Sequence, residues 1–316
     1  MITITEKEVQ NIIPAKEIQK VINAVENGFS DYAKGDVQMP PKQYLDFTEY
    51  EGDLRIMPCY SKVLKLAGTK IVNVHPKNPE KGLPTVMAVV ILNDAKTGKA
   101  LAAIEAAWIT GIRTGAAGAI AAKYLAKKDA KTMGVVGAGQ QAFFQIAATL
   151  KVRDIKEILV YDPKEENFAK LAQSLKELGI EIKKASLEET VKTDILATTT
   201  PVRQPIVKNE WILPGTHINA IGADAQGKEE LDPEILKRSK IVIDHWIQAS
   251  HSGEINVPFA KGIIKKEDIY AELGDIASGK IKGRETDEEI TIFDSTGLAF
   301  QDLYTANIIW RAFNKI

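Results

Sequence analysis

Gly134-Val135-Val136-Gly137-Ala138-Gly139-Gln140-Gln141-Ala142 is the stretch that decides the fold of this chain. It follows a strand-like run, Thr132 to Val136, and opens a helical one. Gly137 permits a tight turn, Gly139 lets backbone amides approach a phosphate closely, and Ala142 lets helix and strand pack closely. A helix that begins here offers free N–H groups and a partial positive charge to an anion. The pattern is typical of a dinucleotide-binding βαβ unit, and a tight turn without a ligand is the alternative.

Strand-like and helical runs continue to alternate beyond this stretch, as in a parallel sheet with crossover helices. The next strand-like run ends at Asp162, 23 residues after Gly139. An acidic residue at this point accepts hydrogen bonds from the adenosine ribose and repels a 2′-phosphate, so the sequence predicts NAD rather than NADP. Lys164 acts in the opposite sense, because its ammonium group can pair with a phosphate. Thr199 and Thr200 end a further strand, and they either line the cofactor groove or form a threonine-rich strand end.

The residues before this alternating region show a different pattern of apolar and polar positions. Residues 5–34 carry the apolar stripe of a helix, with a capping box at Thr5 and a break at Pro14. Residues 37–95 are predicted to form short, mostly antiparallel strands. An Ala-rich helix is predicted over 111–126.

The C-terminal residues 298–313 form one more predicted helix, after a loop at 293–297 that returns the chain to its first part. We therefore expect an α/β fold in which a Rossmann-type, doubly wound domain is inserted into an α+β domain built from both chain ends. The expected boundaries are 115–297 for the inserted domain, and 1–114 with 298–316 for the flanking one.

The composition is that of an ordinary globular protein and excludes several functions. Of 316 residues, 45% are hydrophobic and 26% are charged, and the formal net charge of −1 gives no overall attraction to nucleic acid or to an acidic membrane. The only cysteine is Cys59, which excludes an intrachain disulfide. Outside Ala/Gly-rich stretches, the longest apolar run, 86–92, is far shorter than the ~20 residues of a membrane span. The N-terminus lacks a secretory pattern, so a cytoplasmic location is expected. No standard metal-ligand spacing joins Asp244, His245 and His251, and no metal is expected.

Three charged residues stand out as candidate functional groups. Lys70 lies on an otherwise apolar strand face, where partial burial would lower its pKa and suit acid–base work; alternatively, it is an edge-strand lysine that opposes aggregation. Arg113, between glycines and alanines, suits a forked bond to a carboxylate or phosphate, or it bonds a loop carbonyl. Asp224 follows a strand at the carboxyl edge of the sheet. It either activates water or holds an amine, or it shapes its own turn.

Eight motifs along nearly the whole chain are similar to those of one family. They are MPCY (57–60), TKIVNVHP (69–76), GLPTVMAVVIL (82–92), ITGIRTGAAGAIAAKYLA (109–126), GAGQQA (137–142), HINAIGADAQGKEELD (217–232), GEIN (253–256) and EEITIFDSTGLAFQD (288–302). In this order they resemble the ornithine cyclodeaminase/mu-crystallin family, and within it the archaeal-type alanine dehydrogenases.

The resemblance implies a Rossmann domain inserted into a substrate and dimerisation domain, with two subunits joined through the latter. It also implies that Lys70 is the catalytic, substrate-binding lysine and that Asp224 activates water or assists proton transfer. On the cofactor side it implies roles for Thr85, Arg113, Gly139, Gln140, Asp162, Thr199, Lys228 and Ser295.

Three positions depart from the family pattern near the expected pocket. Lys42 stands where the family commonly has an arginine for the substrate carboxylate, and it keeps the charge but loses the forked geometry. Arg55 stands where ornithine-specific members carry an acidic residue, and a cation there opposes a substrate with a second ammonium group. Ile104-Glu105-Ala106 replaces the Met-Asp-Gly of alanine dehydrogenase relatives. Lys42, Arg55 and Lys70 are the candidate substrate-binding residues.

The implied function is the reversible, NAD-dependent oxidative deamination of a small L-amino acid, such as L-alanine, to a 2-oxo acid and ammonia. One alternative is an ornithine cyclodeaminase, which forms proline and ammonia with no net NADH. Others are a reductase of cyclic imines or ketimines and a non-enzymatic NAD(P)-dependent binding protein. The presence of Lys70 and Asp224 favours catalysis. The expected partners are the substrate and a second copy of the chain, in a homodimer.

Overall fold

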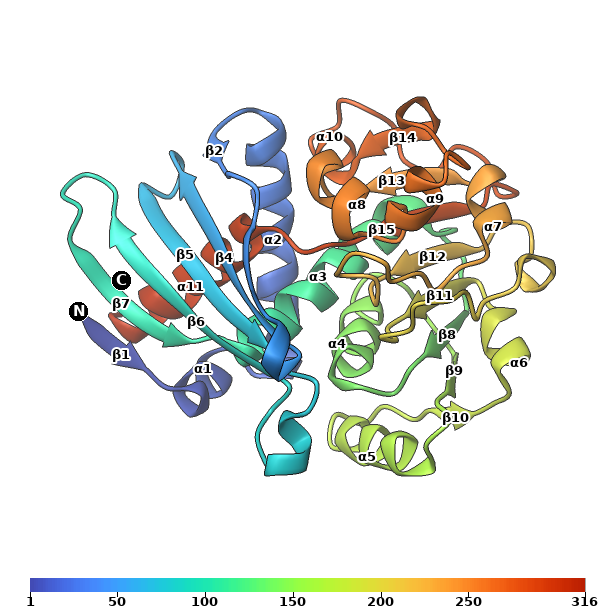
Figure 1. The fold of residues 1–316 in the computed structure, drawn as a ribbon, viewed down its shortest axis with the longest axis horizontal. Coiled ribbons are helices and arrows are strands. Elements are labelled where there is room, and N and C mark those ends of the chain that lie inside the picture. The colour runs from blue at the N-terminus through green and yellow to red at the C-terminus, as the bar shows by residue number, and fades with distance from the viewer. Residues whose placement is uncertain (316) are drawn as a thin grey trace. The chain divides into compact units, whose positions relative to one another are not determined.

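The computed structural model describes residues 1–315 (Figure 1). This part of the chain divides into two compact units. The first unit comprises Met1–Arg113 and the segment from Leu298 onward, and the second comprises Thr114–Gly297. The division falls within one long helix, α3 (Ala107–Leu125). None of the described helices combines the length and the apolar character that a membrane crossing requires.

The first unit is built on a seven-stranded sheet with the order β1-β7-β6-β5-β4-β2, and β3 also pairs with β4. Its strands are β1 (Ile2–Ile4), β2 (Val37–Gln38), β3 (Gln43–Phe47), β4 (Gly52–Ser61), β5 (Leu66–Val74), β6 (Val86–Asp94) and β7 (Ala100–Glu105). All pairs are antiparallel except that of β1 with β7. The antiparallel strands agree with the expectation from the sequence, whereas β1 was not predicted, because three residues are too few to show an alternating pattern.

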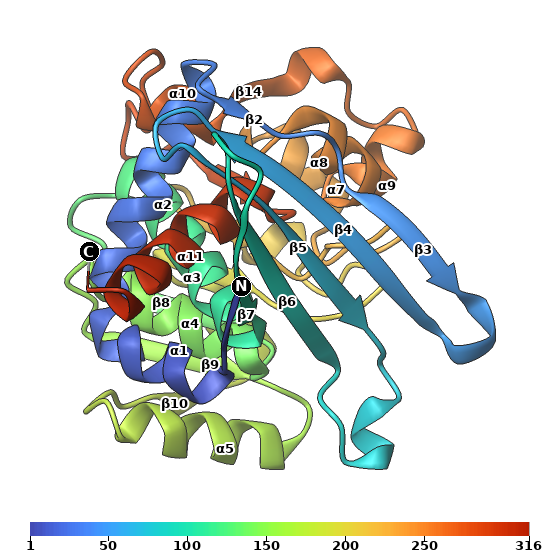
Figure 2. The ribbon, with the colours of Figure 1, turned by 90° about the vertical axis from the view of Figure 1, so that its left-hand side faces the viewer.

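Three helices complete the first unit: α1 (Glu6–Ile12), α2 (Ile18–Ala33) and α11 (Ala299–Phe313). The expected break at Pro14 separates α1 from α2. Helix α11 packs on α2 and on the central strands β4, β5 and β6 (Figure 2). Because side chains of a strand alternate between two faces, Met57, Lys70 and Val90 all point to the α11 side.

The second unit has an eight-stranded, wholly parallel sheet with the order β10-β9-β8-β11-β12-β15-β13-β14. Its strands are β8 (Thr132–Val136), β9 (Glu157–Tyr161), β10 (Lys183–Lys184), β11 (Ile195–Thr198), β12 (His217–Ala220), β13 (Lys240–Ile243), β14 (Ile269–Glu272) and β15 (Thr291–Asp294). Its helices after α3 are α4 (Gln140–Thr149), α5 (Glu165–Lys176), α6 (Leu187–Val191), α7 (Pro233–Lys237), α8 (Trp246–Ser252), α9 (Asn256–Ala260) and α10 (Leu273–Ala277). The expected doubly wound α/β fold is confirmed.

The strand order creates a switch point between β8 and β11. From β8 the chain builds one side of the sheet through β9 and β10, and it then returns to build the other side from β11. Neighbouring residues of β8 face two different hydrophobic cores, because Val135 packs in one and Val136 in the other. Open α/β sheets bind ligands at the carboxyl ends of the strands beside such a switch point.

Two expected element boundaries need correction. Helix α3 begins at Ala107 rather than near residue 111, so Arg113 lies in its second turn rather than at its start. Phe293 and Asp294, expected in a return loop, are the last residues of β15. Strand β15 lies between β12 and β13, and pairing with strands so far away in the sequence leaves no local signal.

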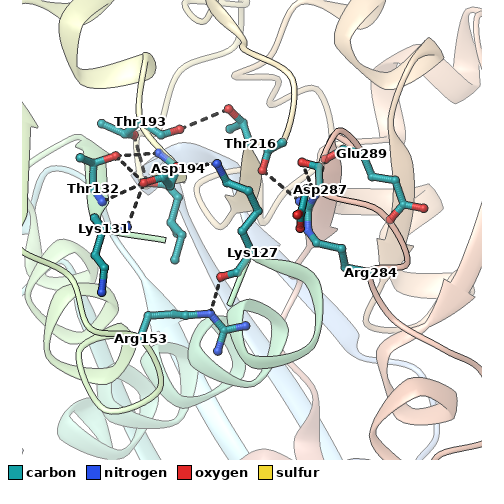
Figure 3. Close-up of polar contacts among 12 residues, drawn as sticks. Lys127, Lys131, Thr132, Arg153, Thr193, Asp194, Thr216, Arg284, Asp287 and Glu289 are labelled. Carbon is teal, nitrogen blue, oxygen red and sulfur yellow. Dashed lines mark hydrogen bonds and ion pairs between the residues drawn. The ribbon is translucent and has the colours of Figure 1, made fainter. Parts of the chain in front are cut away.

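At the amino ends of the strands of this sheet, two arginines bind the C-terminal end of α3. The last carbonyls of a helix lack partners within the helix, so other groups must supply donors. Arg284 donates to the carbonyl of Leu125 at 2.6 Å. Arg153 donates to the carbonyls of Lys123, Ala126 and Lys127. Figure 3 shows both arginines together with Asp194, whose carboxylate accepts hydrogen bonds from Lys131 and Thr132.

Candidate active site

The glycine loop of the second unit joins β8 to α4. Gly137 has φ = 96°, which residues with a Cβ rarely adopt, and a Cβ there would lie 2.9 Å from the Thr199 hydroxyl. Gly139, the residue before α4, borders open space, since nothing lies within 4 Å of a Cβ placed on it. The open side and the free N–H groups of α4, which begins at Gln140, fit a bound pyrophosphate.

Asp162 lies directly after β9 and beside the glycine loop. Its Oδ2 accepts a hydrogen bond from the Ala138 N–H at 2.8 Å. Its Oδ1 accepts from the Lys164 N–H at 2.8 Å and from the Asn167 amide at 3.1 Å. These bonds hold a half-buried carboxylate at the end of β9, where its position and charge fit the hydroxyls of an adenosine ribose.

Thr199 and Thr200 follow β11, on the other side of the switch point. The Thr199 hydroxyl donates to the carbonyls of Val136 at 3.2 Å and Gly137 at 3.0 Å. These bonds hold the backbone of the glycine loop in place. The Thr200 hydroxyl donates to the Glu230 carboxylate at 2.6 Å. Both hydroxyls therefore bond protein groups, and a cofactor contact by either one stays a prediction.

The loops after β12 and β15 place three more expected residues at the carboxyl edge of the sheet. Asp224 and Lys228 form an ion pair at 2.5 Å, with side chains 37% and 18% exposed. Ser295 is buried, and its hydroxyl has no hydrogen-bond partner among the described residues. Burying an unpaired polar group costs free energy, and a polar group of a ligand would remove that cost. This orphaned hydroxyl fits a dinucleotide bound along the edge.

A second cluster lies in the first unit, where β5 faces α11. Lys70 is only 2% exposed, and its Nζ lies 3.0 Å from Oδ1 and 2.9 Å from Oδ2 of Asp302. The Nε of Arg113 lies 3.1 Å from the same Oδ1, and its Nη1 donates to Oε1 of Gln301 at 2.7 Å. Strand β5, helix α3 and helix α11 thus meet around one buried carboxylate.

The cluster carries more positive than negative charge. Burial is the main cause that lowers the pKa of Lys70 to about 7, and the charge of Arg113 acts in the same direction. Asp302 acts in the opposite direction, and Lys42 adds to the lowering. An amine with a pKa near 7 gains and loses a proton readily at neutral pH, as acid–base catalysis requires. While Lys70 is protonated, the two cations outnumber the one carboxylate, and this excess of positive charge fits a substrate carboxylate.

Lys42 and Arg55 have different surroundings. Lys42 lies just before β3, where its charge acts on Lys70. Arg55, on β4, is 6% exposed, and its fork holds both oxygens of Asp53 at 2.9 Å. The Arg55 guanidinium also lies 5.7 Å from the centre of the Tyr44 ring. Because Asp53 balances this charge, Coulomb repulsion of a second substrate ammonium group is weaker than the sequence analysis assumed.

Two residues that the resemblance placed on the cofactor side belong to the first unit. Arg113 shares the Asp302 carboxylate with Lys70, which groups it with the candidate acid–base residue. Thr85 directly precedes β6, and its carbonyl accepts the His75 N–H at 2.8 Å. Contacts of either residue with a cofactor stay predictions.

Sequence reasoning did not single out Asp302, Gln301 or Asp53. The available signal for Asp302 was an acidic residue within a long apolar helix, because a buried charge requires a partner. That partner, Lys70, lies 232 positions away, and nothing local to either residue identifies the other.

Comparison with known proteins identifies the family. The model of the ornithine cyclodeaminase/mu-crystallin family matches residues 5–315. The chain belongs to this family. The expected membership is thereby confirmed, and the match spans both units.

The similar proteins include dehydrogenases, reductases and a lysine cyclodeaminase, and they are of nearly equal length to this chain. The chain is 51% identical to the alanine dehydrogenase of Archaeoglobus fulgidus over 308 residues, which cover 98% of this chain and 94% of the relative. The solved structure of an archaeal alanine dehydrogenase dimer with bound NAD has 49% identity and a TM-score of 0.94, covering 100% of this chain and 97% of that one. The Thermococcus litoralis Δ1-pyrroline-2-carboxylate reductase, in complex with NADH and L-proline, has 39% identity and a TM-score of 0.95, covering 100% and 99%.

Proposed function

We propose that this protein is an NAD-dependent dehydrogenase that converts a small L-amino acid, L-alanine, to a 2-oxo acid and ammonia, reversibly. The observation that carries this proposal is the buried, net-positive cluster of Lys70, Arg113 and Asp302, with a lysine pKa of about 7. The 51% identity with the Archaeoglobus fulgidus alanine dehydrogenase supports the substrate.

NAD is held by the second unit in this proposal. Asp162 bonds the adenosine ribose, and the glycine loop with Gly137, Gly139 and Gln140 holds the pyrophosphate. Thr199 supports that loop, and Lys228 and Ser295 face the remainder of the cofactor. When bound, NAD supplies the acceptor for the hydride that leaves the amino acid Cα.

The first unit binds the amino acid. Arg113 and Lys42 provide positive charge for its carboxylate, and neutral Lys70 takes a proton from its ammonium group. Loss of that proton and of the Cα hydride leaves an iminium ion. Asp224 takes a proton from the water that adds to the iminium carbon, and ammonia leaves when the hydroxyl proton of this adduct passes to its nitrogen and the 2-oxo acid forms. The contribution of these residues is orientation, charge and proton transfer.

Reduction of a cyclic imine is the second candidate activity. The similarity to the Thermococcus litoralis reductase, with its TM-score of 0.95, favours it, and the same positive cluster suits an imine that carries a carboxylate. Such a reaction runs from NADH toward a cyclic amino acid and releases no ammonia.

One panel of assays separates these activities. The protein is incubated with NAD and either L-alanine or L-ornithine, and with NADH and Δ1-pyrroline-2-carboxylate, and NADH, ammonia and proline are measured together. We expect one NADH and one ammonia per alanine consumed. Proline from the imine alone would establish the reductase, and proline with ammonia from ornithine at constant NADH would establish a cyclodeaminase.

A matched pair of variants ties the activity to the cluster. Lys70→Met is expected to lower turnover by roughly 10²–10⁴-fold while NADH binding persists. Lys62→Met removes a lysine whose side chain is 61% exposed, and it is expected to leave turnover unchanged. Equal turnover in the two variants would remove Lys70 from the proposal.

We further propose a homodimer in the cytoplasm, joined through the first unit. Ile56, Ile71 and Val89 pair across β4, β5 and β6 on the sheet face opposite α11, and all three are partly exposed. At the margins of this face, Leu45 is 54% and Met87 41% exposed. A second copy is the proposed cover, since a homologous archaeal enzyme forms a dimer and apolar faces of this kind are typical of homodimer interfaces.

A further inference from the structure

Three buried carboxylates at the carboxyl edge of the second unit form a chain of hydrogen bonds through the backbone. Asp294 accepts the N–H of Glu254 at 2.9 Å and that of Ile255 at 3.2 Å. Glu254 in turn accepts the N–H of Glu230 at 2.9 Å and that of Leu231 at 2.7 Å. The side chains of all three acids are fully buried. Each carboxylate thus fixes the peptide that carries the next one.

The last acid, Glu230, joins the ends of two neighbouring strands. Its Oε1 accepts the N–H of Thr200 at 2.7 Å, after β11, and its Oε2 accepts the N–H of Gly222 at 2.9 Å, after β12. The Thr198 hydroxyl also donates to Oε2, at 2.7 Å. A Cβ on Gly222 would lie 2.2 Å from the Thr200 carbonyl oxygen, so this close approach requires glycine.

Burying these acids costs free energy. In return, they accept hydrogen bonds from backbone N–H groups of loops, which have no partner in a helix or strand. Burial raises the pKa of Glu230 and, together with the charge of Glu230, raises that of Glu254 well above its usual value. Well-packed apolar residues would stabilise the same space at least as well. An apolar side chain, however, cannot accept the N–H groups of loops that leave the sheet. The three buried carboxylates therefore fix the conformation of the loops whose N–H groups they accept.

Asn256 adds a second hold on the same loop. Its Oδ1 accepts the N–H of Gly227 at 2.9 Å, and its Nδ2 donates to the carbonyl of Lys228 at 2.9 Å and to that of Gly253 at 2.5 Å. Gly253 must be glycine, because a Cβ there would lie 2.3 Å from a carboxylate oxygen of Asp294. The four residues 253–256, which the sequence analysis singled out without a role, thus all serve one purpose.

We propose that residues 253–256, seated on Asp294, form a clamp that positions the loop 222–232 and through it Lys228 and Asp224. The clamp holds the loop at 227–228 and at 230–231, and Glu230 of the loop in turn accepts the N–H of Gly222. The ion pair of Lys228 and Asp224 therefore projects from a backbone held on both sides. Asn256, Glu254 and Glu230 are positioning residues. This inference rests on the proposed role of Lys228 toward the cofactor.

The test is a double-mutant cycle read out by NADH binding. Asn256→Ala, Lys228→Ala and the double variant are titrated with NADH and followed by protein fluorescence, well below the unfolding temperature of each. Removal of the two Asn256 hydrogen bonds to the loop is expected to weaken NADH binding about tenfold. The double variant is expected to bind no more weakly than Lys228→Ala, because a clamp acts only through the residue that it positions.

Two control variants keep the result interpretable. Asn209→Ala loses a side-chain hydrogen bond to Arg238, at 2.7 Å, in the same unit but outside this loop, and its NADH affinity is expected to be native. Asn256→Ser serves if Asn256→Ala does not fold, and it is expected to bind NADH more weakly than native. Native NADH affinity of a folded Asn256 variant, native affinity of Lys228→Ala, or additive losses in the double variant would each overturn the clamp. The NADH titration uses no amino acid. It therefore tests the clamp even if the protein does not oxidise alanine.

Discussion

Lys70 is the residue whose protonation sets the expected pH dependence. Its pKa of about 7 means that the neutral amine, which is the proton-accepting form, increases as the pH rises through 7. We therefore expect kcat/KM for L-alanine oxidation to rise with pH through an inflection near 7. Lys70→Arg keeps the charge but cannot lose the proton, so its profile is expected to lack that inflection. Initial rates measured from pH 5.5 to 9 provide the check.

A variant of Asp302, the ion-pair partner of Lys70, tests the same inflection in the pH profile. Asp302 raises the pKa of Lys70, so Asp302→Asn is expected to move the inflection to lower pH. It also leaves two buried cations with one counter-charge fewer, which is expected to lower the free energy of unfolding by about 3–5 kcal/mol. An inflection at the native pH in a folded Asp302→Asn protein would contradict the pairing.

Asp162 is the residue that we expect to set the preference for NAD over NADP. Asp162→Ser removes the carboxylate that repels a 2′-phosphate, so the ratio of NADPH to NADH dissociation constants is expected to fall about tenfold or more. Fluorescence titrations with both cofactors measure this ratio. Lys164→Ala in the same background is expected to restore part of the preference, and tighter binding of NADPH than NADH by the native protein would refute the assignment.

The two halves of the candidate site differ in how far the sequence reveals them. The glycine loop and Asp162 lie within one βαβ unit, where turn geometry and spacing carry the information. Lys70 was found by its place on an apolar strand, but its carboxylate partner Asp302 is 232 residues away. The pairing of Arg55 with Asp53 was also missed, although residues two positions apart on a strand share a face, because Arg55 was considered only in relation to the substrate.

Among the helices and strands, the C-terminal end of α3 is stabilised by an arginine that lies far away in the sequence. Arg284 donates to the carbonyls of Leu125, Gly215 and Glu289. Arg284→Met leaves these partly or fully buried acceptors without their donor, and we expect the free energy of unfolding to fall by about 2–4 kcal/mol while NADH affinity is kept. Chemical denaturation measures the loss, with the exposed Arg311→Met as the control. Equal stability of the two variants would mean that water replaces these bonds.

The elements themselves were predicted where their pattern is local and missed where it is not. The helix pair broken at Pro14 and the strands around Lys70 follow from periodicity and turn residues. The position of β15 inside the second sheet could not be predicted from a local pattern. Its pairing with β12 and β13 depends on burial and on contacts between residues far apart in the sequence.

At the scale of the whole molecule, the proposed homodimer depends on the open sheet face of the first unit. Ile71→Lys places a charge at the centre of that face, and we expect the mass in solution to fall from that of a dimer to that of a monomer, because a buried unpaired charge outweighs the apolar contact. Light scattering measures the mass. Ile247→Lys, at a 53% exposed position in α8, is the matched control and is expected to stay dimeric. A dimeric Ile71→Lys protein would place the interface elsewhere.

The division of the first unit between both chain ends has a consequence for biosynthesis. The ribosome releases the N-terminus first, so the whole of residues 114–297 emerges before α11, which carries Asp302. Until then the nascent sheet lacks the helix that covers it, and Lys70 lacks its counter-charge. Contacts of such long sequence separation form late, after contiguous segments have had time to fold. Helix α11 thus completes the first unit, where we propose that the amino acid binds, and a prematurely terminated product would lack α11 and Asp302 while retaining the second unit.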